Sequence, residues 1–286
     1  MSNFEIPDSL LTWFSKCPFA LTAFSGGVDS SLVAWLANHL LPDRNLAVIS
    51  ASPSLKLSEL DNAKQFAFEH KIPLKIVVTR EMENEHYLEN PANRCFFCKQ
   101  TLYTELADLA KEHPECRVLN GTNTDDLGDY RPGLEAAKEF QVRSPLAECG
   151  FNKQQVRELA AGLNLSCWDK PASPCLSSRI PYGLRVTPEK LRRIEQAEAW
   201  LQEAGFPVCR VRHLEGTARV EVPPEDLDRL HQLKSRMTLH FKQLGFLETE
   251  IDPEGFVSGK LNRVLSSPLP PVRLDSFPKL HNQLFT

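Results

Sequence analysis

The chain has 286 residues, which is enough for about two domains at roughly 150 residues each. Hydrophobic residues make up 42% and charged residues 24%, so a mainly disordered chain is excluded, and a net charge of −4 gives no support for nucleic-acid binding. No apolar run approaches a membrane span and the first residues lack a secretory pattern, so we expect a cytoplasmic protein.

The first part of the chain alternates strand-like and helix-like segments. Strands are predicted at 21–24, 46–49, 74–78 and 118–119, and helices at 32–40, 58–70, 100–112 and 153–163. Asn152 and Gln155 form a capping-box pattern at the last helix. This order predicts a parallel sheet with helices on both faces and ligands beyond the carboxyl ends of its strands.

The second part begins after a stretch rich in Pro, Ser and Cys, from Cys167 to Tyr182. Helices are predicted at 188–204 and 225–233, and strands at 209–213, 218–222 and 246–251. Thr187 and Pro188 mark the start of the first helix, and Gly205 its end. We therefore predict an α/β protein with domains at 1–180 and 181–265 and a Pro-rich tail at 266–286.

A glycine-bearing loop, Ser25-Gly26-Gly27-Val28-Asp29-Ser30-Ser31, lies between a predicted strand and helix. Its glycines let the backbone approach a phosphate, and the helix N-terminus offers unpaired N–H groups. No Lys follows the glycines, so this is not the loop of GTPases and kinases. The carboxylate of Asp29 suits metal bridging or loop capping. A plain turn is the alternative, but the strand–loop–helix setting favours a phosphate loop.

The phosphate loop resembles the PP-loop of N-type ATP pyrophosphatases, which have a Rossmann-like parallel sheet of the adenine nucleotide alpha hydrolase type. That superfamily uses ATP to adenylate a carboxyl or carbonyl oxygen and releases pyrophosphate. Gly121-Thr122-Asn123 followed by Asp125-Asp126 resembles its second nucleotide loop, which implies contacts with ATP and Mg²⁺. For Asp125 and Asp126, a solvated loop is the alternative.

Eight cysteines in a chain without an export signal favour metal binding or thiol chemistry over disulfides. Cys95 and Cys98 have the spacing that lets two thiolates face one metal, and flanking Arg94 and Lys99 are expected to favour the thiolate. Together with Cys175, they would suit a [4Fe–4S] cluster with one open iron. A structural zinc site or packed thiols are the alternatives. Core packing is predicted for Cys17, Cys116, Cys149, Cys167 and Cys209.

The combination of these motifs with Arg131-Pro132-Gly133, Arg143-Ser144-Pro145-Leu146 and the stretch from Trp168 to Arg179 resembles the LarE family, over residues 20–225. The resemblance implies an ATP-dependent sulfur transferase and a homo-oligomer. It also implies that the enzyme converts the carboxylates of pyridinium-3,5-biscarboxylic acid mononucleotide to thiocarboxylates. The product belongs to the nickel-pincer nucleotide cofactor of lactate racemase.

The family divides on the source of sulfur. In one kind, a cysteine matching Cys175 donates its own sulfur and becomes dehydroalanine after a single turnover. In the other, three cysteines hold a [4Fe–4S] cluster that carries an exchangeable sulfide. Because Cys95 and Cys98 accompany Cys175 here, the resemblance favours the cluster type. Sacrificial donation and a persulfide relay are the alternatives.

Arginines alternate along the predicted strand at 209–213. Arg210 and Arg212 should share a face, with His213 and Arg219 nearby, and two guanidinium groups suit a phosphate or carboxylate. By resemblance this is the substrate-phosphate site; a solvated strand face is the alternative. A helix-surface carboxylate is the alternative for Glu198. We assign substrate binding to Arg179, Glu198, Arg210 and Arg212. Arg179 is also expected to lower the pKa of the Cys175 thiol.

Two further functions fit parts of the pattern. Some PP-loop enzymes with three cysteines thiolate tRNA, but that partner calls for a basic surface, and the net charge of −4 does not support one. A nucleotide-sensing or metallochaperone module would keep the loops and cysteines but release no pyrophosphate.

Overall fold

The computed structural model describes residues 5–113, 115–128, 132–257 and 260. The described residues up to Phe256 belong to one compact unit. The predicted tail at 266–286 and Arg131 of the family motif lie outside the described residues. The domain boundary at residue 180 stays a prediction. Within the described part, no helix combines the length and apolar character needed to cross a membrane.

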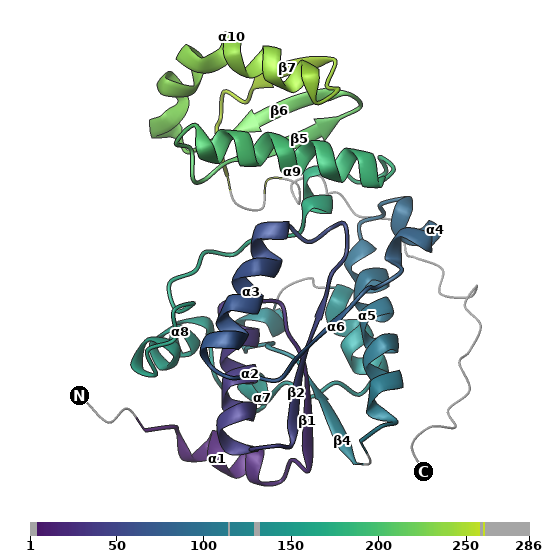
Figure 1. Cartoon of the computed structure of the whole chain (residues 1–286), viewed down its shortest axis with the longest axis vertical. Helices are drawn as coiled ribbons and strands as arrows, with labels where there is room; N and C mark the ends of the chain where they lie inside the picture. The colour runs from purple at the N-terminus through teal and green to yellow at the C-terminus, as the bar shows by residue number, and fades with distance from the viewer. Residues whose placement is uncertain (1–4, 114, 129–131, 258–259, 261–286) are drawn as a thin grey trace. The chain divides into compact units, whose positions relative to one another are not determined.

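A four-stranded sheet in the order β3-β2-β1-β4 organises the first part of the unit (Figure 1). Its strands are β1 (Phe19–Ala23), β2 (Asn45–Ser50), β3 (Leu74–Val77) and β4 (Cys116–Leu119), and all neighbouring pairs are parallel. The prediction of a parallel α/β sheet is confirmed, and the fold is that of the PP-loop superfamily.

Helices cover both faces of this sheet (Figure 1). One core contains Ala20 and residues of α1 (Asp8–Ser15), α2 (Val28–Leu40), α3 (Leu57–Glu69) and α8 (Lys153–Gly162). The other contains Leu21 and residues of α5 (Arg94–Ala110) and α6 (Pro132–Glu139). Successive residues of β1 thus enter opposite cores, as the two-residue period of a strand requires. The predicted capping box at Asn152 and Gln155 is present.

The helix predicted at 100–112 begins six residues earlier, at Arg94, so Cys95 and Cys98 lie in its first turns. Phe97 is buried in another core than Leu102 and Leu106, on a different side of the helix. Helices α1 and α6, of eight residues each, were not predicted, and neither were several shorter elements. These are η1 (Glu81–Glu83), α4 (Glu85–Leu88), η2 (Asp125–Gly128), α7 (Pro145–Glu148) and η3 (Leu176–Arg179). Such short segments carry too little periodicity to be recognised.

The second part of the unit contains a three-stranded sheet covered by two helices. Its strands are β5 (Arg210–Leu214), β6 (Thr217–Glu221) and β7 (Glu248–Ile251), with α9 (Pro188–Glu203), η4 (Pro224–Asp226) and α10 (Leu227–Gln243). Thr187 caps α9 as predicted, by accepting a hydrogen bond from the N–H of Lys190. The helix predicted at 225–233 continues to Gln243, because Met237 and Phe241 extend its buried side.

Candidate active site

The phosphate loop is closed by its own serines. The backbone N–H of Ser25 donates to Ser30 Oγ at 3.1 Å, and the Oγ atoms of these two serines lie 2.9 Å apart. Ser30 Oγ also donates to the carbonyl of Gly27 at 3.1 Å. Gly26 has φ +72°, and a Cβ atom there would lie 2.9 Å from that of Ala63 on α3. The sequence needs glycine at this position for both reasons.

The second nucleotide loop lies directly against the phosphate loop. A Cβ atom on Gly121 would lie 2.5 Å from the backbone N of Ser30 and 2.7 Å from the carbonyl carbon of Asp29. Asn123 Nδ2 donates to Asp29 Oδ1 at 3.1 Å. Thr122 is buried, and its N–H donates to the side chain of Asn120. The two glycine-bearing loops therefore meet where the parallel sheet predicts a ligand.

The acidic residues of these loops accept hydrogen bonds from backbone and side-chain donors. Asp29 Oδ2 accepts from Lys153 Nζ at 2.5 Å, and Asp125 Oδ2 accepts from the backbone N–H of Lys153 at 3.0 Å. Asp126 Oδ2 accepts from the N–H of Asn123 at 3.1 Å. Asp29 thus connects the phosphate loop to Asn123 and Lys153, and its metal-bridging role stays a prediction. Sequence reasoning missed Lys153, because it stands alone at the start of α8.

Lys170 binds the phosphate loop from the segment that leads to Cys175. Its Nζ donates to the carbonyl of Gly26 at 3.1 Å and pairs with Glu59 Oε2 on α3 at 2.6 Å. Lys170 lies in the stretch from Trp168 to Arg179, but sequence reasoning gave it no role. Because 144 residues separate it from Gly26, only the folded chain reveals this contact.

Hydrogen bonds to Ser177 connect the segment that carries the CxxC pair to the segment that carries Cys175. Arg94, which is buried, donates to the carbonyl of Ser177 at 3.0 Å. Tyr87 OH and Ser177 Oγ lie 2.6 Å apart. These bonds fix the start of α5 against the turn that follows Cys175. The three thiols lie within electrostatic range of one another, since a charge on Cys175 raises the pKa of both Cys95 and Cys98.

Opposing effects act on the pKa values of the CxxC thiols. Burial raises the pKa of Cys98 to about 12, and the charges of Glu81 and Cys175 add to that rise. Desolvation also raises the pKa of Cys95, although Arg94 and Lys99 lower it. The flanking cations thus favour the thiolate of Cys95, as expected, but the loss of hydration outweighs their charges.

The donor set fits an iron–sulfur cluster in its chemistry, since thiolates are the ligands of such clusters and the first turns of α5 and the residue before η3 supply three cysteines. Within the described ranges, however, no group of three or more Cys, His, Asp or Glu side chains surrounds one point closely enough to hold a metal ion. The cluster and Mg²⁺ stay proposals.

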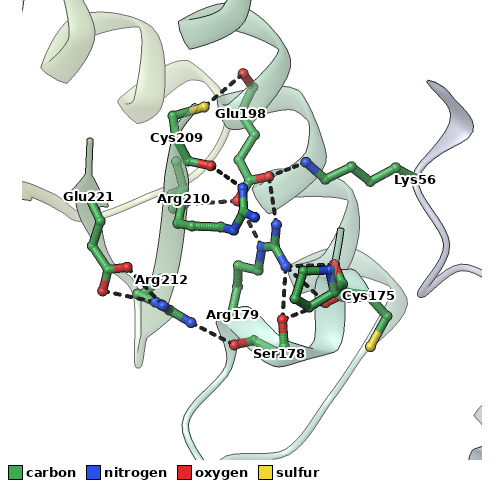
Figure 2. Close-up of polar contacts among 11 residues, drawn as sticks. Lys56, Cys175, Ser178, Arg179, Glu198, Cys209, Arg210, Arg212 and Glu221 are labelled. Carbon is green, nitrogen blue, oxygen red and sulfur yellow. Dashed lines mark hydrogen bonds and ion pairs between the residues drawn. The ribbon is translucent and has the colours of Figure 1, made fainter. Parts of the chain in front are cut away.

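Glu198 lies at the centre of a buried charged cluster (Figure 2). Its Oε1 accepts from Arg179 Nε at 2.9 Å and from the backbone N–H of Val211 at 3.0 Å. Its Oε2 lies 2.5 Å from Lys56 Nζ. The side chains of Arg179 and Glu198 are 0% and 1% exposed. The alternative of a helix-surface carboxylate is therefore wrong, and Lys56 is a member that the sequence did not reveal.

Burial and the neighbouring cations have opposite effects on the pKa of Glu198. Burial alone would raise that pKa, but the charges and hydrogen bonds of Arg179 and Lys56 lower it below its usual value. Glu198 is thus held as a carboxylate, and its negative charge compensates the two buried cations.

Arg179 contacts the backbone around Cys175. Its Nη1 donates to the carbonyl of Pro174 at 2.7 Å and to that of Cys175 at 3.2 Å. Figure 2 shows the Cys175 sulfur on the side away from the guanidinium group. Glu198 and the backbone carbonyls take the donors of Arg179. Arg179 thus fixes the position of the Cys175 segment.

The two strand arginines differ in their partners. Arg212 donates to both oxygens of Glu221, at 3.0 and 2.8 Å, and to the carbonyl of Ser178 at 2.8 Å. Arg210 donates to the carbonyl of Cys209 at 2.8 Å and has no carboxylate partner among the described residues. Burial lowers the pKa of Arg210, and the charge of Arg179 lowers it further.

The charged cluster carries excess positive charge. Its cations are Lys56, Arg179, Arg210 and Arg212, and its carboxylates are Glu198 and Glu221, so four minus two leaves +2. A phosphate dianion would balance this charge. His213 does not belong to the cluster. It is 2% exposed and packs against Phe246, on the opposite side of β5 from Arg210 and Arg212.

Comparison with known proteins gives relatives along most of the chain. The chain is 46% identical over 261 residues to an uncharacterized protein of Synechocystis sp. (slr1717), covering 91% of this chain and 97% of that protein. It is 35% identical over 245 residues to the pyridinium-3,5-bisthiocarboxylic acid mononucleotide synthase of Lactiplantibacillus plantarum, covering 85% and 89%. It is also 28% identical over 194 residues to a component of the glutamine-hydrolyzing GMP synthase of Thermoplasma acidophilum, covering 62% and 61%. No protein-family model matches the chain.

Proposed function

Because this chain belongs to the LarE family of ATP-dependent PP-loop enzymes, we propose that it transfers sulfur to the carboxylates of pyridinium-3,5-biscarboxylic acid mononucleotide. The product would be the bisthiocarboxylic acid mononucleotide named in the Lactiplantibacillus relative.

One structural observation supports this proposal above the others. The segment that carries Cys175 is bonded to the phosphate loop through Lys170 and to the charged cluster through Arg179. A thiol on this segment lies in the stretch that connects an ATP site to an anion site. Sulfur transfer to an adenylated mononucleotide needs an ATP site, a thiol and an anion site that are connected in this way.

Adenylation is the first step. Backbone N–H groups of the phosphate loop and the N-terminus of α2 bind the leaving pyrophosphate. A carboxylate oxygen of the substrate attacks the α-phosphorus of ATP, and the bond from that phosphorus to the bridging oxygen breaks. Mg²⁺ would neutralise the departing charge. Asp125 and Asp126, predicted to contact it, would then exchange present hydrogen bonds for the metal.

Sulfur transfer is the second step. The acyl-adenylate carbon is electrophilic, and sulfur replaces AMP there. A [4Fe–4S] cluster held by Cys95, Cys98 and Cys175 would supply an exchangeable sulfide on its open iron. In the alternative, the Cys175 thiolate attacks and expels AMP to form a thioester. Loss of the Cα proton then breaks the Cβ–S bond, leaving dehydroalanine and a thiocarboxylate.

The charged cluster is proposed to hold the substrate phosphate. Arg210 has no carboxylate partner among the described residues, so its guanidinium is available to an incoming phosphate. Arg212 already has Glu221 and Ser178 as partners, and it would add its positive charge to the phosphate site. Arg179 and Glu198 would support substrate binding indirectly, by fixing the position of the Cys175 segment.

The test is the iron and sulfide content of protein purified without oxygen, with its visible spectrum. A near-stoichiometric cluster that is lost in Cys95→Ala and kept in Cys116→Ala would support the cluster type. Iron-free protein that loses the mass of one sulfur atom at Cys175 after reaction would support sacrificial donation. Protein that releases no pyrophosphate with ATP and the pyridinium mononucleotide would contradict the proposed function in either form.

A further inference from the structure

Lys170 is bonded to the backbone of the phosphate loop, although sequence reasoning gave it no role. Its Nζ donates to the Gly26 carbonyl at 3.1 Å, and Glu59 Oε2 lies 2.6 Å from the same nitrogen. The side chains of Lys170 and Glu59 are 20% and 17% exposed. The ammonium group thus has a carboxylate partner and a fixed carbonyl partner.

We propose that Lys170 is a positioning residue that orients the Gly26–Gly27 peptide for phosphate binding and couples ATP binding to the position of Cys175. This inference rests on the proposed function, because it assigns phosphate binding to the loop at residues 25–31.

The orientation follows from the planarity of the peptide group. In a trans peptide, the carbonyl of one residue and the N–H of the next point in opposite directions. Because Lys170 holds the Gly26 carbonyl, the Gly27 N–H points away from Lys170. That N–H has no acceptor among the described residues. It is followed by the first N–H groups of α2, which have no intrahelical partners. Lys170 therefore aligns one more donor with the helix N-terminus.

Gly26 makes this orientation dependent on Lys170. Glycine adopts positive and negative φ about equally well, so the peptides around Gly26 are free to rotate in the isolated loop. The close approach of Ala63 limits that freedom on one side, and the Lys170 ammonium fixes the carbonyl on the other. Without Lys170, the carbonyl oxygen could turn toward an incoming phosphate and repel it.

The coupling to Cys175 follows from the short connection between two fixed points. Lys170 is bonded to the phosphate loop, and the Pro174 and Cys175 carbonyls are bonded to Arg179. Pro171 and Pro174 limit the conformations of the chain that connects Lys170 to Cys175. A shift of the Gly26 peptide on ATP binding is therefore transmitted to Cys175 over a stiff segment.

The first experiment compares steady-state pyrophosphate release by Lys170→Gln and the full-length wild type. We expect the KM for ATP to rise roughly tenfold or more, as for loss of one hydrogen bond to a charged group. The KM for the pyridinium mononucleotide should stay unchanged. Lys170→Arg, which keeps a cationic donor, should restore most of the ATP affinity. Lys64→Gln is the matched control, since Lys64 forms an exposed pair with Asp61 on α3.

The second experiment measures amide hydrogen exchange at 25–31 and 168–176, with and without a non-hydrolysable ATP analogue. In the wild type, the analogue should slow exchange in both segments. In Lys170→Gln at saturating analogue, the slowing should persist at 25–31 and disappear at 168–176. A variant with wild-type KM and wild-type slowing in both segments would overturn the inference. A wild type that fails to bind the analogue would contradict the proposed function, and this inference with it.

Discussion

Arg179 and Glu198 form a buried ion pair, with Arg179 Nε donating to Glu198 Oε1 at 2.9 Å and neither side chain more than 1% exposed. Arg179 lies beside Cys175 and Glu198 lies on α9, so the pair joins the thiol segment to the part of the unit that carries Arg210 and Arg212. Lys56, from the segment before α3, binds the same carboxylate.

Removing the charge of Glu198 should destabilise the protein strongly. Glu198→Gln leaves Arg179 and Lys56 buried without a counter-charge, and breaking a buried pair in this way costs about 3–5 kcal/mol. Urea unfolding at neutral pH measures the loss. Glu85→Gln is the control, since Glu85 pairs with Arg185 at the surface, and it should unfold like the wild type. Equal stability of the two variants would show that Glu198 is solvated.

Adding one methyl group at Gly121 should disrupt the contact of the two nucleotide loops. The Cβ atom of Gly121→Ala would lie 2.5 Å from the backbone N of Ser30, so the phosphate loop must move. Overpacking of this kind costs about 1–3 kcal/mol, and we expect ATP-dependent pyrophosphate release to fall roughly tenfold. The Cβ atom of Gly128→Ala meets no atom of the described residues within 4 Å, so this variant should keep wild-type activity. Equal rates for both variants would refute this loop contact.

Arg210 should contribute to substrate affinity and not to ATP affinity. Arg210→Ala removes the guanidinium that lacks a carboxylate partner among the described residues. We expect the KM for the pyridinium mononucleotide to rise roughly tenfold or more, as for loss of a charge-assisted hydrogen bond. Arg192→Ala, on the exposed side of α9, is the control. An unchanged KM for the mononucleotide would exclude Arg210 from the phosphate site.

Cys175 should be required for sulfur transfer and dispensable for adenylation. In Cys175→Ala, the phosphate loop and the Arg179 contacts to backbone carbonyls are kept, because they do not involve the sulfur atom. We expect pyrophosphate release in a single turnover without thiocarboxylate, which mass spectrometry of the product detects. Loss of adenylation as well would give Cys175 a role beyond sulfur handling.

His213 should make stability depend on pH. Neither ring nitrogen has a hydrogen-bond partner in the described part of the chain. Burial, with the charges of Lys190 and Arg193, lowers the pKa of His213 from 6.5 to about 4. The unfolded chain therefore binds a proton first as the pH falls, and stability is lost between pH 6.5 and 4, by about 3 kcal/mol at most.

Unfolding measured across this range gives the test. His213→Leu should flatten the pH dependence of the free energy of unfolding between pH 6.5 and 4, whereas His231→Gln, an exposed control on α10, should leave it unchanged. A slope in His213→Leu equal to that of the wild type would assign the pH dependence to other groups.

The sheet and the nucleotide loops could be predicted because their signals are local. The apolar runs at β1 and β2 and the helical spacing of α2 predict parallel strands with a helical crossover. Gly26 and Gly121 lie at the ends of strands, so the topology alone brings their loops to one edge. The predicted start of the helix that carries Cys95 is too late, because Phe97 packs into another core than Leu102 and Leu106 and so breaks the apolar period of the helix.

The sequence by itself therefore determined the α/β class, the two loops and the residue types available for chemistry. The tertiary structure decided which partner each cation contacts. Lys170 binds the Gly26 carbonyl, Lys56 binds the Glu198 carboxylate, and Arg179 binds the backbone carbonyl of Cys175 rather than its thiol. These pairs join residues from different elements, so no local period or spacing specifies them. Burial in the folded chain also raises the pKa of the Cys98 thiol, by more than the charge of neighbouring Lys99 lowers it.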